Sequence, residues 1–443
     1  MKGAAFPALA ALTALLCAGC AGVTAADRGP RGDAVARLAP TTFAPWREDF
    51  GDPGLRDLLR QADAGALDVK AALARLERAR AEVELADAGR GVNVVGGFEA
   101  AVGGRNVSSV GSAGTPTLEV GKDIDLWGRS GHARDAARSD RDAASLDVDG
   151  VRLLIGAQTA RAYYALGAAR SLESLEQRRH ALAARALDLV VQRKASGAAM
   201  GAAAVGRRDT LAAVAARVQQ FHDEGGLQAA QLADLSGGQG PPGVHVRLPE
   251  VDSPPVAVSS AVVDARPDVR AAWARLAAAD ERRAAAIAAS RPQFRIAATL
   301  GAPDATIATL LDVRALAWAV AGGLTQEIVD GGARRAKVHA AAAEADEAEI
   351  AYRQAVLAAW SDVRSAMVAD AQAHRDLLVA QASAASAASA VDVGRRRHEL
   401  GAVDGVAVVD LEDAAIQGAE GVVEARRRLA EARIQLVLAR GGA

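Results

Sequence analysis

The sequence predicts a mainly α-helical protein with a small β part, in which a unit of long helices occurs twice. The first observation behind this fold class is internal repetition. The segment Asp68–Leu76, DVKAALARL, recurs 200 positions later as DVRAAWARL, and Arg193-x-x-x-Gly197 recurs 204 positions later as Arg397-x-x-x-Gly401. Two matches at nearly the same offset, in well-separated parts of the chain, indicate a tandem duplication.

The second observation is the placement of proline. All 14 prolines lie outside two stretches of the chain, 117–240 and 304–443. Proline costs about 3 kcal/mol inside a helix, because it lacks the N–H and clashes with the preceding turn. Each half of the chain can therefore form very long, unbroken helices.

The composition excludes several classes of function. The charged residues nearly cancel, at a net charge of −2, which gives no argument for a nucleic-acid partner. The arginines interleave with Asp and Glu, as they do on solvated helix faces. The seven histidines show no metal-ligand spacing, and no glycine-rich phosphate loop is present. We therefore expect no cofactor, no metal and no enzymatic activity.

The N-terminus has the features of a bacterial lipoprotein signal. An apolar stretch, 4–17, has signal-peptide length and is too short to span a bilayer. It ends in Leu16-Cys17-Ala18-Gly19-Cys20, which resembles a lipoprotein cleavage box with Cys20 as the lipidated residue. The alternative is a plain secretory signal cleaved near Ala21. Beyond residue 20 no apolar run reaches about 18 residues, so no transmembrane helix is expected.

The first half begins with a helix-start signal, Asp52-Pro53-Gly54, and a helix is predicted at 67–87. Two extended segments follow within about 92–126. In the second of them, 117–126, apolar residues at every other position alternate with polar or small ones, as in a strand with one apolar face. Lys122 interrupts that apolar face.

The second half repeats this plan. A helix predicted at 267–290 leads to strands within about 293–329, the return strand being 318–329. Strands of about 9–12 residues have the length that a tilted transmembrane strand needs. Four such strands cannot close a barrel within one chain, so other subunits would have to complete it.

A long helix and a return helix are predicted after each pair of strands. The first long helix, 129–194, would be about 100 Å long at 1.5 Å per residue. Within it Leu153, Ala157, Ala160, Tyr164 and Gly167 have the spacing of a helix–helix seam. The helices break at 197–205 and 400–406, with return helices at 207–235 and 410–439.

These elements define five segments of the chain. They are a signal peptide (1–20), a flexible tether (21–42), a first repeat (43–235), a Gly/Pro-rich linker (236–255) and a second repeat (256–443).

Four motifs of this chain resemble those of the outer membrane efflux proteins, and the lipoprotein-type, TolC-like members that serve pumps of the RND type are the nearest fit. The motifs occur in the family's order and cover about 43–440. They are Asp123–Arg129 (DIDLWGR), Asp330–Ala336 (DGGARRA), Arg266–Ala271 (RPDVRA) and Trp46–Leu55.

The resemblance implies a homotrimer in the outer membrane. Four strands from each chain would close a twelve-stranded barrel, and the long helices would form a hollow α-barrel across the periplasm. A periplasmic adaptor and an inner-membrane pump would load this passive conduit with small molecules. The partners implied are thus two further copies, the adaptor, the pump and outer membrane lipid.

The resemblance also places the working residues at the two helical breaks. The adaptor would dock at Gly197 and Ala198 in the first break, and at Gly401, Ala402 and Val403 in the second. A gate would be built from Asp404, Asp410 and Arg397, with carboxylates converging on the trimer axis and attracting cations. Members often carry two Asp one turn apart here, whereas this chain has Ala407 at the first position. Lys122 and Gln326-Glu327 also depart from the family's pattern.

Two alternatives stay open at this stage. The same scaffold could serve protein or peptide secretion, because specificity would reside mainly in the pump. A non-pore periplasmic lipoprotein with coiled coils would instead require 91–126 and 293–329 to be loops.

Overall fold

The computed structural model describes residues 52–103, 111–195, 201–238, 248, 261–301 and 317–442. The expected signal peptide, the tether, Cys20 and most of the expected linker lie outside the described residues. The described chain divides into two compact units. We call them the sheet unit, Arg75–Ala144 with Ala271–Arg353, and the helical unit, which holds the remaining described residues.

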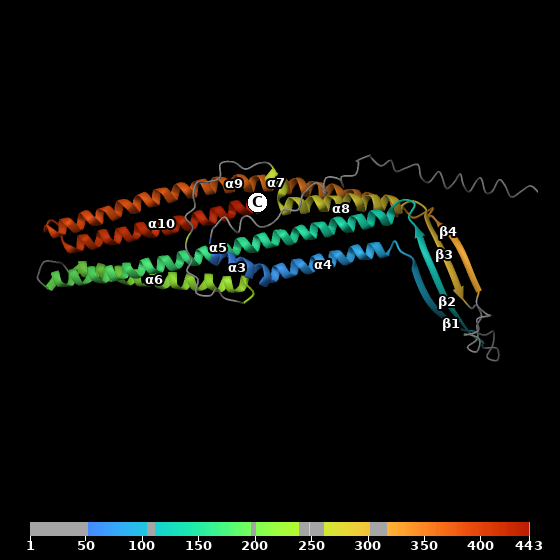
Figure 1. Cartoon of the computed structure of the whole chain (residues 1–443), viewed down its shortest axis with the longest axis horizontal. Coiled ribbons are helices and arrows are strands. Elements are labelled where there is room, and N and C mark those ends of the chain that lie inside the picture. Colours follow the sequence, from blue (N-terminus) through green and yellow to red (C-terminus); the bar gives the residue numbers. More distant parts are fainter. Residues whose placement is uncertain are drawn as a thin grey trace, which may run out of the picture. The chain divides into compact units, whose positions relative to one another are not determined.

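The same succession of elements occurs twice along the chain (Figure 1). The first half contains α3 (Pro53–Gly65), α4 (Leu67–Ala88), β1 (Asn93–Gly103), β2 (Gly111–Ile124), α5 (Arg129–Ala195) and α6 (Gly201–Leu235). The second half contains α7 (Ala261–Ala265), α8 (Pro267–Ala289), β3 (Gln293–Gly301), β4 (Ala317–Thr325), α9 (Ala333–Glu399) and α10 (Gly405–Ala439). The long helices α5 and α9 both have 67 residues, and the return helices α6 and α10 both have 35.

The helix start predicted at Asp52 is confirmed. The Asp52 carboxylate accepts hydrogen bonds from the N–H groups of Gly54 and Leu55, at 2.8 and 3.4 Å, and Pro53 occupies the first turn of α3. Both features satisfy or remove N–H groups that a helix start leaves without partners. The other carboxylate oxygen of Asp52 accepts from the Tyr163 hydroxyl at 2.8 Å, which ties this start to α5.

The four strands form one antiparallel sheet in the order β1-β2-β3-β4. The β2–β3 pair joins the two halves of the chain. Two predicted ends were wrong: β2 begins at Gly111 rather than at 117, and β4 ends at Thr325 rather than at 329. Among the described strands, β1 and β4 each have one edge without a partner strand.

The register separates the side chains of the sheet into an apolar and a polar face, because successive residues of a strand point to opposite sides. The polar face includes Glu119, Asp123 and Arg295, and Arg295 donates to Glu119 at 2.7 Å. Lys122 shares the other face with apolar neighbours. The exposed apolar residues of that face include Val94, Phe98, Leu118, Val120, Ile296, Leu300, Trp318, Val320 and Leu324.

The main hydrophobic core lies in the helical unit. The predicted seam of α5 is confirmed, since Leu153, Ala157, Ala160 and Tyr164 are all buried in one cluster with α3 and α10. Many of these positions are alanine, which allows helices to approach closely. The rings of Tyr163 and Tyr164 lie edge to face at 5.4 Å and fill the widest part of this core.

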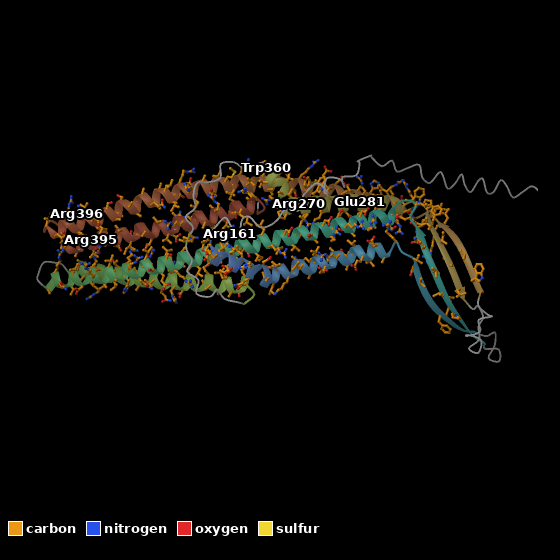
Figure 2. All side chains as sticks on the ribbon, viewed as in Figure 1. Arg161, Arg270, Glu281, Trp360, Arg395 and Arg396 are labelled. Carbon is orange, nitrogen blue, oxygen red and sulfur yellow. The ribbon has the colours of Figure 1, made fainter. Side chains whose placement is uncertain are left out.

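In the sheet unit, ion pairs and ring contacts join the helices near the strands. The Nδ1 of His132 on α5 lies 2.7 Å from the carboxylate of Glu281 on α8, which is labelled in Figure 2. The rings of Trp273 and Tyr352 meet edge to face at 5.1 Å, joining α8 to α9.

One helix of the described chain, α9, contains an 18-residue stretch that is long and apolar enough to cross a membrane. We did not expect such a stretch from the sequence. Alanine accounts for it, because alanine counts as apolar and is frequent along α9, although few residues of the stretch are buried within the chain.

Candidate functional site

The turn between α9 and α10, which we call the second tip, depends on a glycine at residue 401. Gly401 adopts φ +72°, a left-handed conformation that side chains disfavour. The N–H of Ala402 donates to the Arg397 carbonyl, and that of Gly401 to the His398 carbonyl, both at 2.8 Å. These bonds satisfy carbonyls that the end of α9 would otherwise leave free.

Asp404 starts α10 and also joins it to the first half of the chain. Its carboxylate accepts from the Ala407 N–H at 2.8 Å, as an N-cap does, and from Arg193 at the end of α5 at 2.7 Å. The Ala407 N–H, and after it the Arg193 guanidinium, lower the pKa of Asp404 below its usual value. Asp404 is therefore held as a carboxylate by both contacts.

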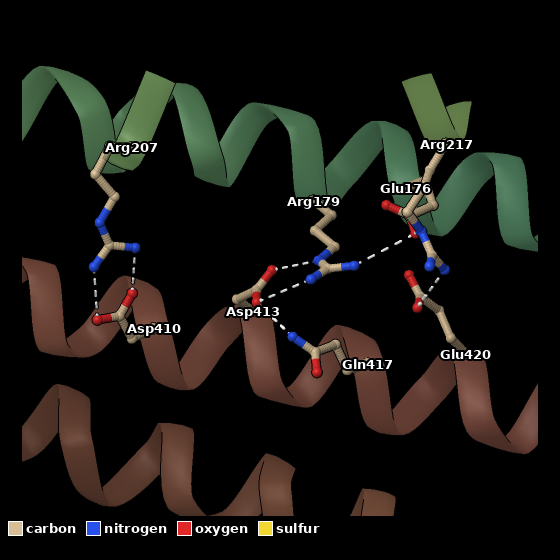
Figure 3. A network of polar contacts seen from close by, with 8 residues as sticks. All are labelled: Glu176, Arg179, Arg207, Arg217, Asp410, Asp413, Gln417 and Glu420. Atoms are coloured by element: carbon tan, nitrogen blue, oxygen red, sulfur yellow. Dashed lines mark hydrogen bonds and ion pairs between the residues drawn. The ribbon is translucent and has the colours of Figure 1, made fainter. Parts of the chain in front are cut away.

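Asp410, nearly two turns further along α10, forms a two-pronged ion pair with Arg207 on α6. The two guanidinium nitrogens donate to the two carboxylate oxygens at 2.7 and 2.9 Å (Figure 3). The hydrogen bond to Asp410 is also the largest cause of the raised pKa of Arg207. Such paired geometry is the most directional contact available to these groups.

A more deeply buried network continues along α10 (Figure 3). Arg179 on α5 donates to Asp413 at 2.6 Å and approaches Glu176 at 3.4 Å. Glu176, which is fully buried, also pairs with Arg217 on α6. Arg217 in turn lies 3.5 Å from Glu420 on α10. Three helices from both halves of the chain are thus linked through charged groups.

Burial and the nearby Glu176 carboxylate raise the pKa of Glu420. The guanidiniums of Arg179 and Arg217 act in the opposite direction without reversing the shift. Glu420 therefore holds its proton to a higher pH than an exposed glutamate does.

The third predicted gate residue, Arg397, lies elsewhere. It has no ion pair among the described residues, and it lines an apolar cavity of about 410 Å³ between α9 and α10. Neither Asp404 nor Asp410 uses the run 395–397; Arg395 pairs instead with Glu412 at 2.7 Å. Arg395 and Arg396 are labelled near the end of α9 in Figure 2.

The other predicted site residues divide into two groups. Ala402 and Val403 belong to the second tip with Gly401, and the Val403 carbonyl lies 2.9 Å from His398 Nδ1. Gly197, Ala198 and Cys20 lie outside the described residues. Within those residues, no group of three or more His, Cys, Asp or Glu could hold a metal ion.

Sequence reasoning missed the cationic partners, which are Arg193, Arg207 and Arg179. One signal could have found Arg207. It lies 203 residues before Asp410, close to the 204-residue offset of the two tip motifs, so the two halves carry opposite charges at nearly equivalent positions.

Comparisons with known proteins agree with this architecture. A family model described as outer membrane efflux protein matches residues 58–238 and 258–442. The chain is 28% identical to the pyoverdine export outer membrane protein OpmQ of Pseudomonas putida, over 90% of this chain and 87% of OpmQ. It is 27% identical to the outer membrane protein OprJ of Pseudomonas aeruginosa, over 90% and 86% of the two chains.

A solved structure shows the same fold. The outer membrane channel CmeC of Campylobacter jejuni superposes with a TM-score of 0.81, covering 95% of this chain and 93% of CmeC at 19% sequence identity.

Proposed function

This chain belongs to the outer membrane efflux protein family, and from that membership we propose that three copies of it form one passive conduit across the outer membrane and the periplasm. The family gives its place in the outer membrane and its role in efflux. The number of copies, the closure of the pore, the gate and the partners are our proposal.

The open sheet is the observation that carries this proposal. It has an exposed apolar face, a polar face with paired charges, and two edges without partner strands in the described chain. Unpaired strand edges are not tolerated in lipid, because their N–H and C=O groups would have no partner there. Pairing β1 of one copy with β4 of the next removes both edges and keeps neighbouring strands antiparallel.

This pairing is head-to-tail, since β1 and β4 are different strands, and head-to-tail contacts generate rings. Three copies of a four-stranded sheet give twelve strands, an even number within the range of outer membrane barrels. The apolar face would then contact lipid and the polar face would line the pore.

The helical unit also exposes apolar side chains that a neighbouring copy would cover. Large apolar residues on α4, α6 and α9 are well exposed, which is unusual for a soluble monomer. The most exposed include Leu67, Leu227, Leu357, Val368 and Val379.

Crosslinking between the edge strands tests the ring. A double variant, Val95→Cys with Ala321→Cys, would carry one thiol on β1 and one on β4, on the polar face. A bifunctional maleimide should produce covalent dimers and trimers and nothing larger. The two single variants and the parent chain are the controls and should give no trimer. A double variant that stops at dimers would reject head-to-tail closure by three copies.

We place the gate at the second tip. Asp404 and Asp410 each pair with an arginine of the first half, so the two helical hairpins of one chain are fastened together there. Opening would require these pairs to separate. Arg397, which has no ion pair in the described chain, would contact an acidic group of a neighbouring copy. Planar-bilayer conductance tests this gate, as set out in the Discussion.

The adaptor would dock at the two tips, at Gly401, Ala402 and Val403 and at Gly197 and Ala198. Nothing lies within 4 Å of a Cβ added to Gly401, so the turn is open to an approaching partner. The conduit would perform no chemistry, and an inner-membrane pump of the RND type would supply the energy. We propose small molecules as its cargo, because OpmQ is named for the export of pyoverdine.

We propose a lipid anchor at Cys20 as well. Metabolic labelling with a palmitate analogue should label the parent chain, and Cys20→Ser should lose the label. Cys17→Ser is the matched control and should keep it. A label that persists in the Cys20 variant would reject the anchor.

A further inference from the structure

Exposed cations gather where the strands join the helices. α4 leads into β1, β2 into α5, α8 into β3 and β4 into α9, so all four junctions lie at one end of the antiparallel sheet (Figure 1). Five exposed cations stand at or beside these junctions, and we call them the junction belt: Arg90, Lys122, Arg291, Arg335 and Lys337.

The positive charge of the junction belt is not compensated locally. None of the five cations forms an ion pair within the described residues, whereas neighbouring Arg295 pairs with Glu119 at 2.7 Å and Arg334 with Asp330 at 2.7 Å. Two junction carboxylates lack a cationic partner in the described chain. They are Asp125, which accepts hydrogen bonds from the start of α5, and Glu327. Five cations against two carboxylates leave a surplus of positive charge.

Exposed apolar side chains alternate with these cations. Ile328 and Val329 are 77% and 90% exposed just after β4, and Leu126 and Trp127 are exposed just after β2. The Trp127 indole N–H donates to the Pro292 carbonyl at 2.7 Å, and the Arg291 guanidinium lies over the indole ring at 5.0 Å. A tryptophan with a polar tip, beside a cation and apolar residues, suits the boundary between lipid tails and headgroups.

Lys122 shows which side of the sheet this chemistry faces. It lies opposite Ile296 in the register, and its neighbours on the same face are Val120 and Ile124. An ammonium among apolar residues near the end of a strand can reach the headgroup layer along its flexible chain. Lys122 therefore points its charge to the apolar side of the sheet, while Arg295 is paired on the polar side.

We propose that the junction belt binds the phosphate of anionic phospholipid headgroups, in the leaflet that the helical end of the sheet meets. This inference rests on the proposed conduit, because it requires the apolar face to contact lipid. Each Lys or Arg near an anionic membrane surface strengthens binding by about fivefold, so two cations account for roughly 30-fold. The belt would hold the barrel at a fixed depth, with a preference for anionic over zwitterionic lipid.

Native mass spectrometry of the detergent-solubilised full chain tests the proposal. Phosphatidylglycerol and phosphatidylcholine would be titrated separately, and the lipids retained on the protein counted. The parent should retain phosphatidylglycerol preferentially, and Lys122→Gln with Arg291→Gln should lower that preference roughly 30-fold. Arg56→Gln with Arg208→Gln removes two exposed cations from the helical unit and should leave the preference unchanged.

Two further arms separate the possible causes. Inorganic phosphate at millimolar concentration should not displace the lipid; displacement would show an anion site without a membrane role and would overturn the proposal. An equal preference in the parent and in the belt variant would overturn it too. The same spectra report the number of copies, and bilayer recordings report conductance. A conducting trimer without lipid preference rejects the belt alone, whereas the absence of a trimer and of conductance rejects the conduit.

Discussion

Arg207 and Asp410 meet across the two halves of the chain, with guanidinium and carboxylate joined by two hydrogen bonds of 2.7 and 2.9 Å. They lie 203 residues apart and belong to corresponding return helices, α6 and α10. A carboxylate that could have faced a pore as a free charge is thus neutralised by its own chain. This pair acts as a fastening between hairpins rather than as a cation site in the single chain.

Removing this pair should ease opening of the conduit. Asp410→Ala, and equally Arg207→Ala, should raise the open probability of single channels in planar bilayers. A half-exposed pair contributes about 0.2–1 kcal/mol, so three copies would shift the open–closed equilibrium roughly 3- to 100-fold. The double variant should resemble either single one, because both remove the same contact.

Arg395→Ala is the matched control for the gate. It removes a pair that joins α9 to α10 within one hairpin, and it should leave the open probability unchanged. Equal effects of Arg395→Ala and Asp410→Ala would mean that general loss of charge, not the link between hairpins, opens the channel.

The buried pair of Asp370 and Arg433 should be the most sensitive charged contact for stability. Asp370 on α9 is only 1% exposed and accepts from Arg433 on α10 at 2.8 Å. Asp370→Ala would leave a mostly buried guanidinium without its counter-charge, which destabilises by about 3–5 kcal/mol. Urea unfolding followed by circular dichroism measures this change.

Two variants frame that result. Asp57→Ala breaks an exposed pair with Arg60 and should change stability by less than about 0.5 kcal/mol. Asp370→Leu with Arg433→Met should recover most of the loss, because apolar residues of similar size avoid the buried charge altogether. Failure of this rescue would point to a specific hydrogen-bonding role.

The raised pKa of Glu420 predicts an unusual dependence of stability on pH. Its folded-state pKa lies above the ordinary value of 4.5, first because of burial and then because of Glu176. The favourable contribution of the protonated form is therefore complete below about pH 4.5 and is lost as pH rises through the folded pKa. At neutral pH the ionised Glu420 should destabilise the fold.

Glu420→Gln should accordingly stabilise the protein at neutral pH and have little effect near pH 4. The difference in unfolding free energy between variant and parent, followed from pH 4 to 8, isolates this group from the other carboxylates. Glu344→Gln, an exposed position on α9, should give a flat difference. A flat difference for Glu420→Gln as well would show that Arg179 and Arg217 compensate its charge fully.

Gly401 should separate the demands of the turn from those of docking. Gly401→Val should lower stability by about 1–2 kcal/mol, because a side chain strains the left-handed conformation. Asn tolerates that conformation better, so Gly401→Asn should lower stability by less than half as much. If a partner docks here, Gly401→Asn should still abolish dye efflux from cells that carry this channel alone. Unchanged efflux would leave Gly401 with a backbone role only.

The sequence predicted the helices well because their ends are marked by local chemistry. Asp52 and Pro53 start α3, and the helix predicted at 267–290 is observed at Pro267–Ala289. The return helices begin earlier than predicted, since glycine at 201 and 405 does not delay them. At Gly405 the preceding Asp404 supplies the cap.

Strand ends were harder to predict, because they depend on partner strands. Pro116 argued against a strand, yet β2 runs through it opposite Phe98. The pairing of β2 with β3 begins only at Thr117, so the missing N–H of Pro116 deprives β3 of nothing. Likewise β4 ends at Thr325 because its partner β3 begins opposite, at Gln293.

The charged contacts of the tips could not be predicted from spacing along the chain. Asp404 and Asp410 were found as carboxylates near a turn, but their partners lie 211 and 203 residues away. Only the packing of α5 and α6 against α10 brings these groups together. The sequence shows helices and their breaks; it does not show which helices are neighbours.

The equal lengths of the paired helices limit how this protein can evolve. With 67 residues in both long helices and 35 in both return helices, the two turns end at one level, where Arg193 reaches Asp404. Seven residues inserted into α5 and α6 alone would displace one turn by about 10 Å and separate that pair. Insertions would have to occur in all four helices together, so the chain works as a ruler whose graduations are fixed in duplicate.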